Sequence, residues 1–293
     1  MTTIVAISGK KQAGKTTLAN FLHGYELVRK GIIQEFRISE EGKLVVNCVS
    51  EDSNGQPVES LGILDLNSTS SEFYDYAEQM IWPHIKLYNF ADSLKEICIG
   101  LFDIPSECVY GTDEQKNQIQ EHLRWENMPG VICWPNYVDC CGNADYSDIE
   151  PKQIGLTIHK SGPMTAREFM QFLGTDIMRR MYEPIWTKNC IKRIYSDNPE
   201  IAIIADCRFP NEADAIIQED GLIIRLTRNI YECDHKSETA LDSYSGFSSV
   251  LDNKNLSINE SCEEFLKIAI QLGITKAMPP RKTSRFSTPM KAR

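Results

Sequence analysis

The fold is decided by the stretch Ile4-Val-Ala-Ile-Ser-Gly-Lys-Lys-Gln-Ala-Gly14-Lys-Thr-Thr-Leu-Ala-Asn-Phe-Leu22. It opens with an apolar, β-branched run, passes through the pattern G-x-x-x-x-G-K-T and continues with the apolar spacing of a helix. A loop of this kind between a strand and a helix is the usual setting for phosphate binding. The sequence therefore predicts a phosphate-binding loop, followed by a helix from about Lys15 to Arg29. A glycine turn that binds nothing is the alternative.

The residue types of this loop suit phosphate chemistry. Glycines at 9 and 14 allow positive φ and bring backbone N–H groups close to phosphate oxygens, where the helix dipole adds positive charge. In such loops the lysine, here Lys15, reaches the β- and γ-phosphates. The hydroxyl of Thr16 is predicted to bind Mg²⁺ and Thr17 to contact the α-phosphate.

Composition limits the class of protein. The 293 residues carry a formal net charge of −10, which argues against broad or sequence-specific nucleic-acid binding by the folded part. No apolar run approaches the roughly 20 residues that a membrane span needs, and Met1 leads directly into the first predicted strand. We therefore expect a cytoplasmic protein with no membrane contact.

The C-terminal segment differs from the rest. Residues 275–293 contain six Lys or Arg, three Pro and no acidic residue. Such a segment is predicted to be a disordered basic tail, which can dock onto nucleic acid or an acidic replication partner. The preceding residues, 1–274, are predicted to form one domain.

Strand and helix patterns alternate along that domain. They predict an α/β fold with a mainly parallel, three-layer sheet. A hairpin at 32–38 and 43–49 lies in a predicted insertion, 31–83, that also has a short strand at 61–66, and a weakly patterned stretch, 105–163, is predicted to be an irregular substrate-side insertion. The other predicted strands are 84–90, 201–206, 222–228 and 255–258, and the other helices are 91–102, 165–182, 186–195, one from Pro210, and 261–272.

A magnesium-binding carboxylate is predicted after the buried strand 201–206. Asp206 ends this strand, in the position of a carboxylate that holds Mg²⁺ through water beside a phosphate loop. Arg208 follows at the carboxyl end of the strand, whereas Arg225 is predicted to point along its own strand. The alternative is that Asp206 only caps the helix that begins at Pro210.

The helix predicted at 165–182 carries substrate-binding candidates. Thr165 and Glu168 form a capping box, and Arg167, Gln171 and Asp176 lie largely outside its apolar stripe. Lys95 is predicted to face the region above the strand ends, where α/β sheets bind ligands; a solvated lysine is the alternative. Trp125 and Trp134 can stack on a base, although packing is favoured for both.

Ten cysteines are scattered without a regular spacing, which favours small buried side chains. Cys133, Cys140 and Cys141 form one cluster, with His122 and His159 within loop reach. A zinc site there is the weaker alternative.

Four segments together resemble the deoxynucleoside monophosphate kinases of tailed bacteriophages. Segments near Phe90-Ala-Asp-Ser-Leu-Lys95 and Tyr110-Gly-Thr-Asp-x-x-Lys-Asn117 are also similar. The four are the phosphate loop, Arg167-Glu-Phe-Met-Gln-Phe-Leu-Gly-Thr-Asp176, Ile204-Ala-Asp-Cys-Arg-Phe-Pro-Asn-Glu-Ala-Asp-Ala215 and Asp234-His-Lys-Ser-Glu-Thr-Ala-Leu241.

The resemblance implies a P-loop kinase that moves the γ-phosphoryl group of ATP, with Mg²⁺, onto a deoxynucleoside 5′-monophosphate for DNA precursor synthesis. The implied catalytic residues are Lys15, Asp206 and Arg208, and the acceptor-binding residues are Lys95, Arg167, Gln171, Asp176 and Arg208. Arg228, His235 and Glu238 are implied to form a mobile lid. The implied ATP-binding residues are Gly9, Lys10, Lys11, Gln12, Ala13, Gly14, Lys15, Thr16, Thr17 and Arg228.

Two other functions stay open from the sequence. The same fold can phosphorylate another small molecule, such as dephospho-coenzyme A. A non-catalytic nucleotide-binding protein, recruited to a replication assembly by the basic tail, is the second. A homodimer is compatible with either, and the sequence does not determine base preference.

Overall fold

The computed structural model describes residues 2–51, 57–66, 68, 70–134, 157–229 and 239–278. The chain forms two compact units, residues 1–87 with 197–293, and residues 88–196. The predicted single domain with its two insertions stays a prediction.

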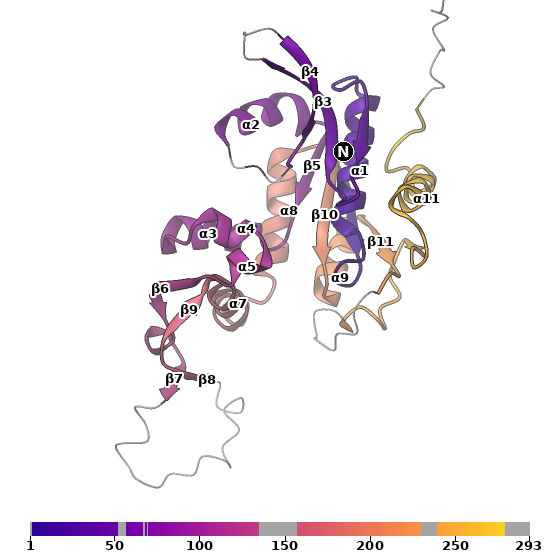
Figure 1. Ribbon diagram of the computed structural model, residues 1–293. Helices are drawn as coiled ribbons and strands as arrows, with labels where there is room; N and C mark the ends of the chain where they lie inside the picture. The colour runs from indigo at the N-terminus through magenta and orange to yellow at the C-terminus, as the bar shows by residue number, and fades with distance from the viewer. Residues whose placement is uncertain are drawn as a thin grey trace, which may run out of the picture. The chain divides into compact units, whose positions relative to one another are not determined.

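The first unit is built on a five-stranded sheet (Figure 1). The pairs β1–β10, β1–β11 and β11–β12 are parallel. From β1 the chain continues to β5 at one edge of the sheet, whereas from β10 it crosses β1 to reach β11 on the other side. The strand order therefore reverses between β1 and β10, the kind of place where α/β sheets bind ligands. In sheet order the strands are β12 (Ser249–Leu251), β11 (Leu222–Leu226), β1 (Thr3–Ser8), β10 (Ile201–Cys207) and β5 (Ile85–Tyr88).

Helices cover both faces of this sheet, which confirms the three-layer α/β prediction. Val5 and Ile7 of β1 share one buried cluster with side chains of α1 (Lys15–Arg29) and α11 (Ile258–Gln271). Ile4, which precedes Val5, points to the opposite face, as alternation in a strand requires. That face is covered by α9 (Pro210–Gln218), which packs on β1 and β11.

The predicted hairpin is confirmed, but its first strand is short. Antiparallel strands β2 (Phe36–Ile38), β3 (Leu44–Glu51) and β4 (Pro57–Ile63) form a second sheet. Ile32 and Ile33 do not extend β2, because their N–H groups donate to the carbonyl of Leu27 and their side chains pack on the core. Only the first half of the predicted strand at 61–66 lies within β4, which ends at Ile63, and α2 (Ser71–Tyr76) and the π-helical η1 (Ala77–Ile81) follow.

The second unit contains short helices and two small sheets. Strands β6 and β9 pair antiparallel, and β7 and β8 pair parallel. Trp125 is buried and stacks on His159 with 3.9 Å between ring centroids, so it serves packing. The elements are α3 (Asp92–Phe102), α4 (Ser106–Tyr110), α5 (Asp113–Lys116), β6 (Ile119–Arg124), η2 (Trp125–Asn127), β7 (Val131–Trp134), β8 (Thr157–Lys160), β9 (Pro163–Thr165), α7 (Ala166–Gln171), η4 (Phe172–Arg179) and α8 (Ile185–Asp197).

The helix predicted at 165–182 is not a uniform α-helix. Its capping box between Thr165 and Glu168 is confirmed, but from Phe172 the turns widen into π-helix. The Gly174 carbonyl accepts a hydrogen bond from the indole N–H of Trp186 at 3.1 Å. The distant Trp186 thus gives Gly174 a partner outside the helix, which is a tertiary contact that spacing along the sequence does not reveal.

The strand predicted at 255–258 is wrong. The last strand is β12, and Ser257 instead begins helix α11 through a capping box with Glu260. The intervening Asn253 is buried and hydrogen-bonded to the phosphate loop, which removes this segment from the sheet. Within the described ranges, no helix is both long and apolar enough to cross a membrane.

Candidate active site

The two glycines of the loop serve different purposes. Gly14 has φ +99°, a left-handed conformation that side chains other than glycine rarely adopt. Gly9 does not have the predicted positive φ; instead it allows close packing, since an added Cβ would lie 3.1 Å from both Ala13 Cβ and Leu226 Cβ. The loop therefore lies directly against the end of β11.

Lys15 folds over the loop that it follows. Its Nζ donates to the carbonyl oxygens of Gly9 and Lys10, both at 2.7 Å. The ammonium group is therefore held at the loop, at the N-terminus of α1, where an anion is favoured. Thr16 is exposed and Thr17 is half-buried.

A carboxylate ties the loop to the neighbouring strand. Asp242 lies 3.3 Å from Lys10 Nζ and accepts a hydrogen bond from Arg225 Nη2 at 2.8 Å. Arg225 Nη1 also donates to Ser8 Oγ at 3.0 Å. Arg225 does not point along its strand as predicted, because it bridges β11 to β1 and to Asp242.

The carboxyl end of β10 carries Asp206 and Arg208. The β1–β10 register shifts by one residue between Ala6 and Ser8, so that one extra residue of β10 lies beside this part of β1. Irregularities of this kind redirect side chains next to active sites. The buried carboxylate of Glu212 accepts the backbone N–H groups of Arg208 at 2.8 Å and Phe209 at 3.1 Å, which fixes the loop that presents Arg208.

Cys207, between the two candidates, is fully buried. Burial, and to a smaller extent the nearby Glu212 and Asp206, raise the pKa of its thiol well above the ordinary value. It is a small buried side chain, as the scattered spacing of the cysteines predicts.

Arg228 is connected to the phosphate loop through Asn253. Arg228 Nε donates to the Asn253 carbonyl at 3.1 Å, and its Nη2 donates to the carbonyl of Leu256. The Asn253 side chain accepts from Arg228 N and donates to Ala13 O, both at 2.9 Å. Sequence reasoning missed Asn253, because an isolated asparagine in a polar loop carries no local signal of this role.

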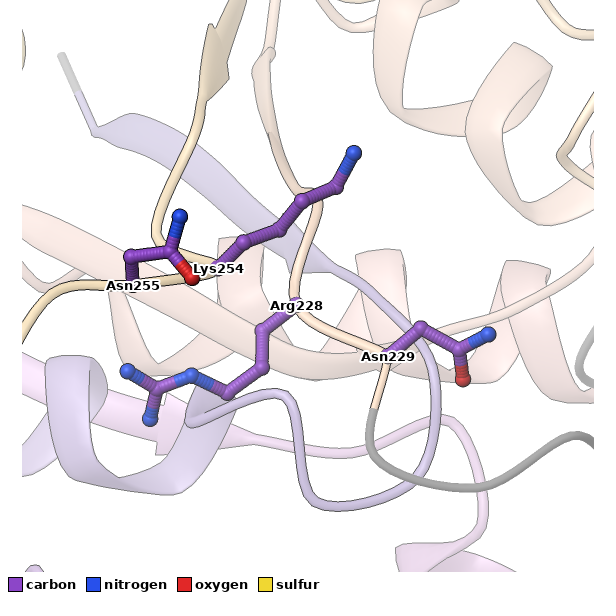
Figure 2. A pocket seen from close by; sticks show the side chains of 4 residues that line it. All are labelled: Arg228, Asn229, Lys254 and Asn255. Carbon is purple, nitrogen blue, oxygen red and sulfur yellow. The ribbon is translucent and has the colours of Figure 1, made fainter.

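A pocket of about 400 Å³ is lined by Arg228, Asn229, Lys254 and Asn255 (Figure 2). A second pocket of about 450 Å³ uses Asn229 and Lys254 too, and extends to the loop residue Lys10. Its remaining lining is Arg225, Leu226, Thr227, Leu241, Asp242, Phe247 and Val250. Together they offer polar and apolar surface beside the loop at the carboxyl ends of β11 and β12.

The second unit contains a separate group of cations. Arg167 Nη2 is 2.6 Å from Asp113 Oδ1. Lys95 Nζ lies 4.6 Å from the centre of the Tyr110 ring and 3.9 Å from Asp92 Oδ1, so Lys95 is not simply a solvated lysine. These residues belong to the α3, α4, α5 and α7 helices, of which α4 packs against the other three.

The other two acceptor-binding candidates on this helix are exposed. Among the described residues, Arg167 forms its ion pair with Asp113 and has no hydrogen bond or ion pair with Gln171 or Asp176. Partial burial raises the pKa of the Asp176 carboxyl, against the opposing effect of Arg180. The role of Gln171 and Asp176 as acceptor contacts therefore stays a prediction.

Some predicted residues lie outside the described residues. These are the lid residues His235 and Glu238, and Cys140 and Cys141 of the suggested zinc cluster. Cys133 is half-buried. Among the side chains that the structure describes, no three His, Cys, Asp or Glu are grouped as a metal site.

The parallel sheet with a glycine-rich loop after its central strand, a lysine at the loop and a carboxylate on the adjacent strand defines a P-loop nucleotide-binding fold. A sequence model of the deoxynucleotide monophosphate kinase family matches residues 3–261, and the chain belongs to that family. This confirms the resemblance found in the sequence.

Two viral relatives agree with this assignment. Over 192 residues, the chain is 29% identical to a protein of Acanthamoeba polyphaga mimivirus that is provisionally named a deoxynucleotide monophosphate kinase; the match covers 60% of this chain and 77% of the relative. Over 118 residues it is 28% identical to the deoxynucleoside-5′-monophosphate kinase of Escherichia phage T5, covering 37% and 46%. The chain is thus a nucleotide kinase, for which ATP is the phosphate donor.

Proposed function

We propose that the chain transfers the γ-phosphoryl group of ATP to the 5′-phosphate of a deoxynucleoside monophosphate and so supplies viral DNA synthesis. The observation that carries this proposal is the Lys15 loop at the strand-order reversal of the sheet, in a chain that matches the family over residues 3–261. ATP binds along Gly9 to Thr17, with its phosphates at the loop N–H groups and at Lys15.

The nucleoside part of ATP occupies the pocket at Arg228, Asn229, Lys254 and Asn255. This pocket is connected to the loop through Asn253, so base and phosphates are held by one hydrogen-bonded unit. Arg228 has a dual role here, since it also borders the segment with His235 and Glu238 that we propose as the lid.

Magnesium fits the residues that the loop and β10 provide. The hydroxyl of Thr16 and the carboxylate of Asp206, acting through water, are the hard oxygen donors that Mg²⁺ prefers. When bound, the ion neutralises charge on the β- and γ-phosphates. Arg208 presents a planar cation at the same strand end, which suits the charge that develops on the transferring group.

The acceptor phosphate binds at Lys95 and Arg167, with Gln171 and Asp176 as further contacts to the nucleotide. Because the attacking group is a phosphate oxygen that is already anionic, no general base is needed. The chain then has to position and neutralise two phosphate groups, and Lys15, Arg208 and Arg167 are the residues for that task.

The remaining proposals concern organisation. We assign residues 1–274 to the kinase domain, with insertions at 31–83 and 105–163, and place the protein in the host cytoplasm. The tail from 275 onward is a docking segment for nucleic acid or a replication protein, and a homodimer is the proposed assembly. The start of this tail is attached to α1: Lys276 O accepts from the Tyr25 hydroxyl at 3.1 Å, and Met278 N donates to it at 2.9 Å.

The direct test is ADP release from ATP and Mg²⁺ by the purified chain. The acceptors are the deoxynucleoside and ribonucleoside 5′-monophosphates and dephospho-coenzyme A, with a reaction lacking acceptor as control. Rapid turnover with one or more deoxynucleotides is expected. Turnover with dephospho-coenzyme A alone would show that this compound, and not a deoxynucleotide, is the acceptor. ATP binding without turnover would favour the non-catalytic docking protein.

A further inference from the structure

Lys116 is a cation of the segment 110–117 that resembles the kinase family, and neither the sequence analysis nor the proposed function gives it a role. It ends α5, a single turn fixed at its start by a capping box between Thr112 and Gln115. The turn is also packed tightly, because a Cβ added to Gly111 would lie 2.1 Å from the carbonyl oxygen of Glu107. The Lys116 side chain therefore extends from a backbone whose position is fixed.

The surroundings of Lys116 are rich in positive charge. Its amine is partly buried, and this burial, followed by the nearby Lys95 and Arg167, lowers the pKa of Lys116, while Asp113 acts in the opposite direction. Asp113 is 65% exposed and already pairs with Arg167 at 2.6 Å. Lys116 and Arg167 thus share one mostly exposed carboxylate on this helix, and like charges at short range cost free energy unless an anion joins them.

The two neighbouring cations also have unused binding capacity. The Nε of Arg167 is buried and has no hydrogen-bond partner among the described residues. The nearest carboxylate to Lys95, Asp92, is 3.9 Å away and is shared with Arg193 Nη1 at 3.7 Å. A buried guanidinium N–H without a partner is costly, and an anionic oxygen is the strongest acceptor that it can gain.

We propose that Lys116 binds the dianionic 5′-phosphate of the nucleotide acceptor together with Lys95 and Arg167. The inference rests on the proposed function, in which Lys95 and Arg167 bind that phosphate. Arg167 offers a planar donor group for two phosphate oxygens, and the lysines supply point charges around the others. Lys116 therefore does not contribute to the binding affinity of a nucleoside that lacks the phosphate.

The test compares Lys116→Met and Lys116→Arg in the full chain, with Lys192→Met as the matched control. Lys192 is an exposed lysine of α8 in the same unit. Steady-state kinetics give the acceptor KM and the ATP KM, and calorimetry without ATP gives the Kd of each deoxynucleoside monophosphate and of the matching deoxynucleoside. Lys116→Met should raise the acceptor KM and Kd about 10- to 100-fold.

In Lys116→Met, the Kd of the deoxynucleoside and the ATP KM should stay unchanged. Lys116→Arg should recover most of the affinity for the acceptor nucleotide, and Lys192→Met should match the wild type. An unchanged acceptor Kd in Lys116→Met, with an active wild type, overturns the inference but leaves the proposed function intact. Equal loss of nucleoside and nucleotide affinity also overturns it, because that outcome indicates a structural role.

A wild type that phosphorylates none of the deoxynucleotides overturns the proposed function instead. Titration with inorganic phosphate then decides the inference separately: weaker binding in Lys116→Met supports an anion site at Lys116, and equal binding overturns it. Thermal unfolding checks each variant, and Lys116→Gln replaces Lys116→Met if the apolar side chain prevents folding.

Discussion

The phosphate loop and the cation cluster of Lys95, Lys116 and Arg167 both offer binding groups for phosphate, but they are built differently. The loop is one continuous segment whose geometry comes from its backbone, with a positive φ at Gly14 and close packing at Gly9. The cluster takes one side chain from each of α3, α5 and α7. A site formed by backbone groups of one segment can be recognised from a local sequence motif. A site formed by side chains of several helices depends on how those helices pack.

The two sites also differ in how their cations are satisfied. Lys15 donates to two loop carbonyl oxygens at 2.7 Å. In the cluster, Arg167 Nε is without a partner in the described structure, and Lys116 lies on the same turn as Asp113, the carboxylate already paired with Arg167. The loop is therefore complete in itself, while the cluster gains more from an anion. The following predictions test this contrast.

The largest expected effect is at the loop lysine. Lys15→Ala should lower kcat about a thousandfold, because it removes the cation that stabilises the transferring phosphoryl group, and it should leave the fold intact. Steady-state ADP release measures the effect, with Lys192→Ala as an exposed-lysine control. Near-normal turnover in Lys15→Ala would remove Lys15 from the catalytic residues.

The helix behind the loop should respond to acid. His23 is fully buried, its Nδ1 donates to Ala19 O at 2.9 Å, and burial lowers its pKa to about 4. Because the unfolded chain protonates this imidazole near pH 6.5, the neutral side chain supports the fold fully above that pH, and its contribution is lost as the pH falls toward 4. The total is about 3 kcal/mol.

Urea unfolding at several pH values measures this effect. The wild type should lose more stability between about pH 6.5 and 4 than His23→Gln, in which the titrating group is absent. His122→Gln, at an exposed histidine of the other unit, should follow the wild type. Parallel pH profiles for wild type and His23→Gln would contradict the prediction.

The cluster should affect acceptor binding rather than ATP binding. Arg167→Met should raise the acceptor KM about thirtyfold, near 2 kcal/mol, and Arg167→Lys should give a smaller rise because a point charge replaces a planar group. Arg124→Met removes a comparable surface pair, with Glu126 at 2.7 Å, and should have no such effect. A change in the ATP KM instead would assign Arg167 to the donor site.

The smallest expected effect separates backbone strain from ligand binding. Gly14 and Gly31 both have positive φ, +99° and +74°, so replacing either with Ala should lower the unfolding free energy by about 1 kcal/mol. Only Gly14→Ala should also weaken ATP binding, by about tenfold. Thermal unfolding and ATP titration of both variants make the comparison. Equal ATP affinities of Gly14→Ala and Gly31→Ala would show that the backbone conformation of Gly14 is not needed for phosphate binding.

The fold was largely predictable because its core elements have strong local signals. The phosphate-loop strand and helix, the buried strand ending near Asp206 and the capping box at Thr165 follow from periodicity and capping rules. The errors have a common cause. The π-helical turn at Gly174 and the loop at Asn253 depend on partners distant in the chain, Trp186 and Ala13.

By itself, the sequence determined the P-loop, the parallel α/β sheet and the resemblance to deoxynucleoside monophosphate kinases, since each depends on contiguous residues with restricted backbone or hydrophobic patterns. Only the tertiary structure revealed the Asn253 link between Arg228 and the loop, the Arg225 bridge to Ser8 and Asp242, and the ion pair of Arg167 with Asp113, which lies on the same helical turn as Lys116. These groups are polar side chains from separate elements. Their meeting depends on the packing of whole helices and strands, which no local spacing encodes.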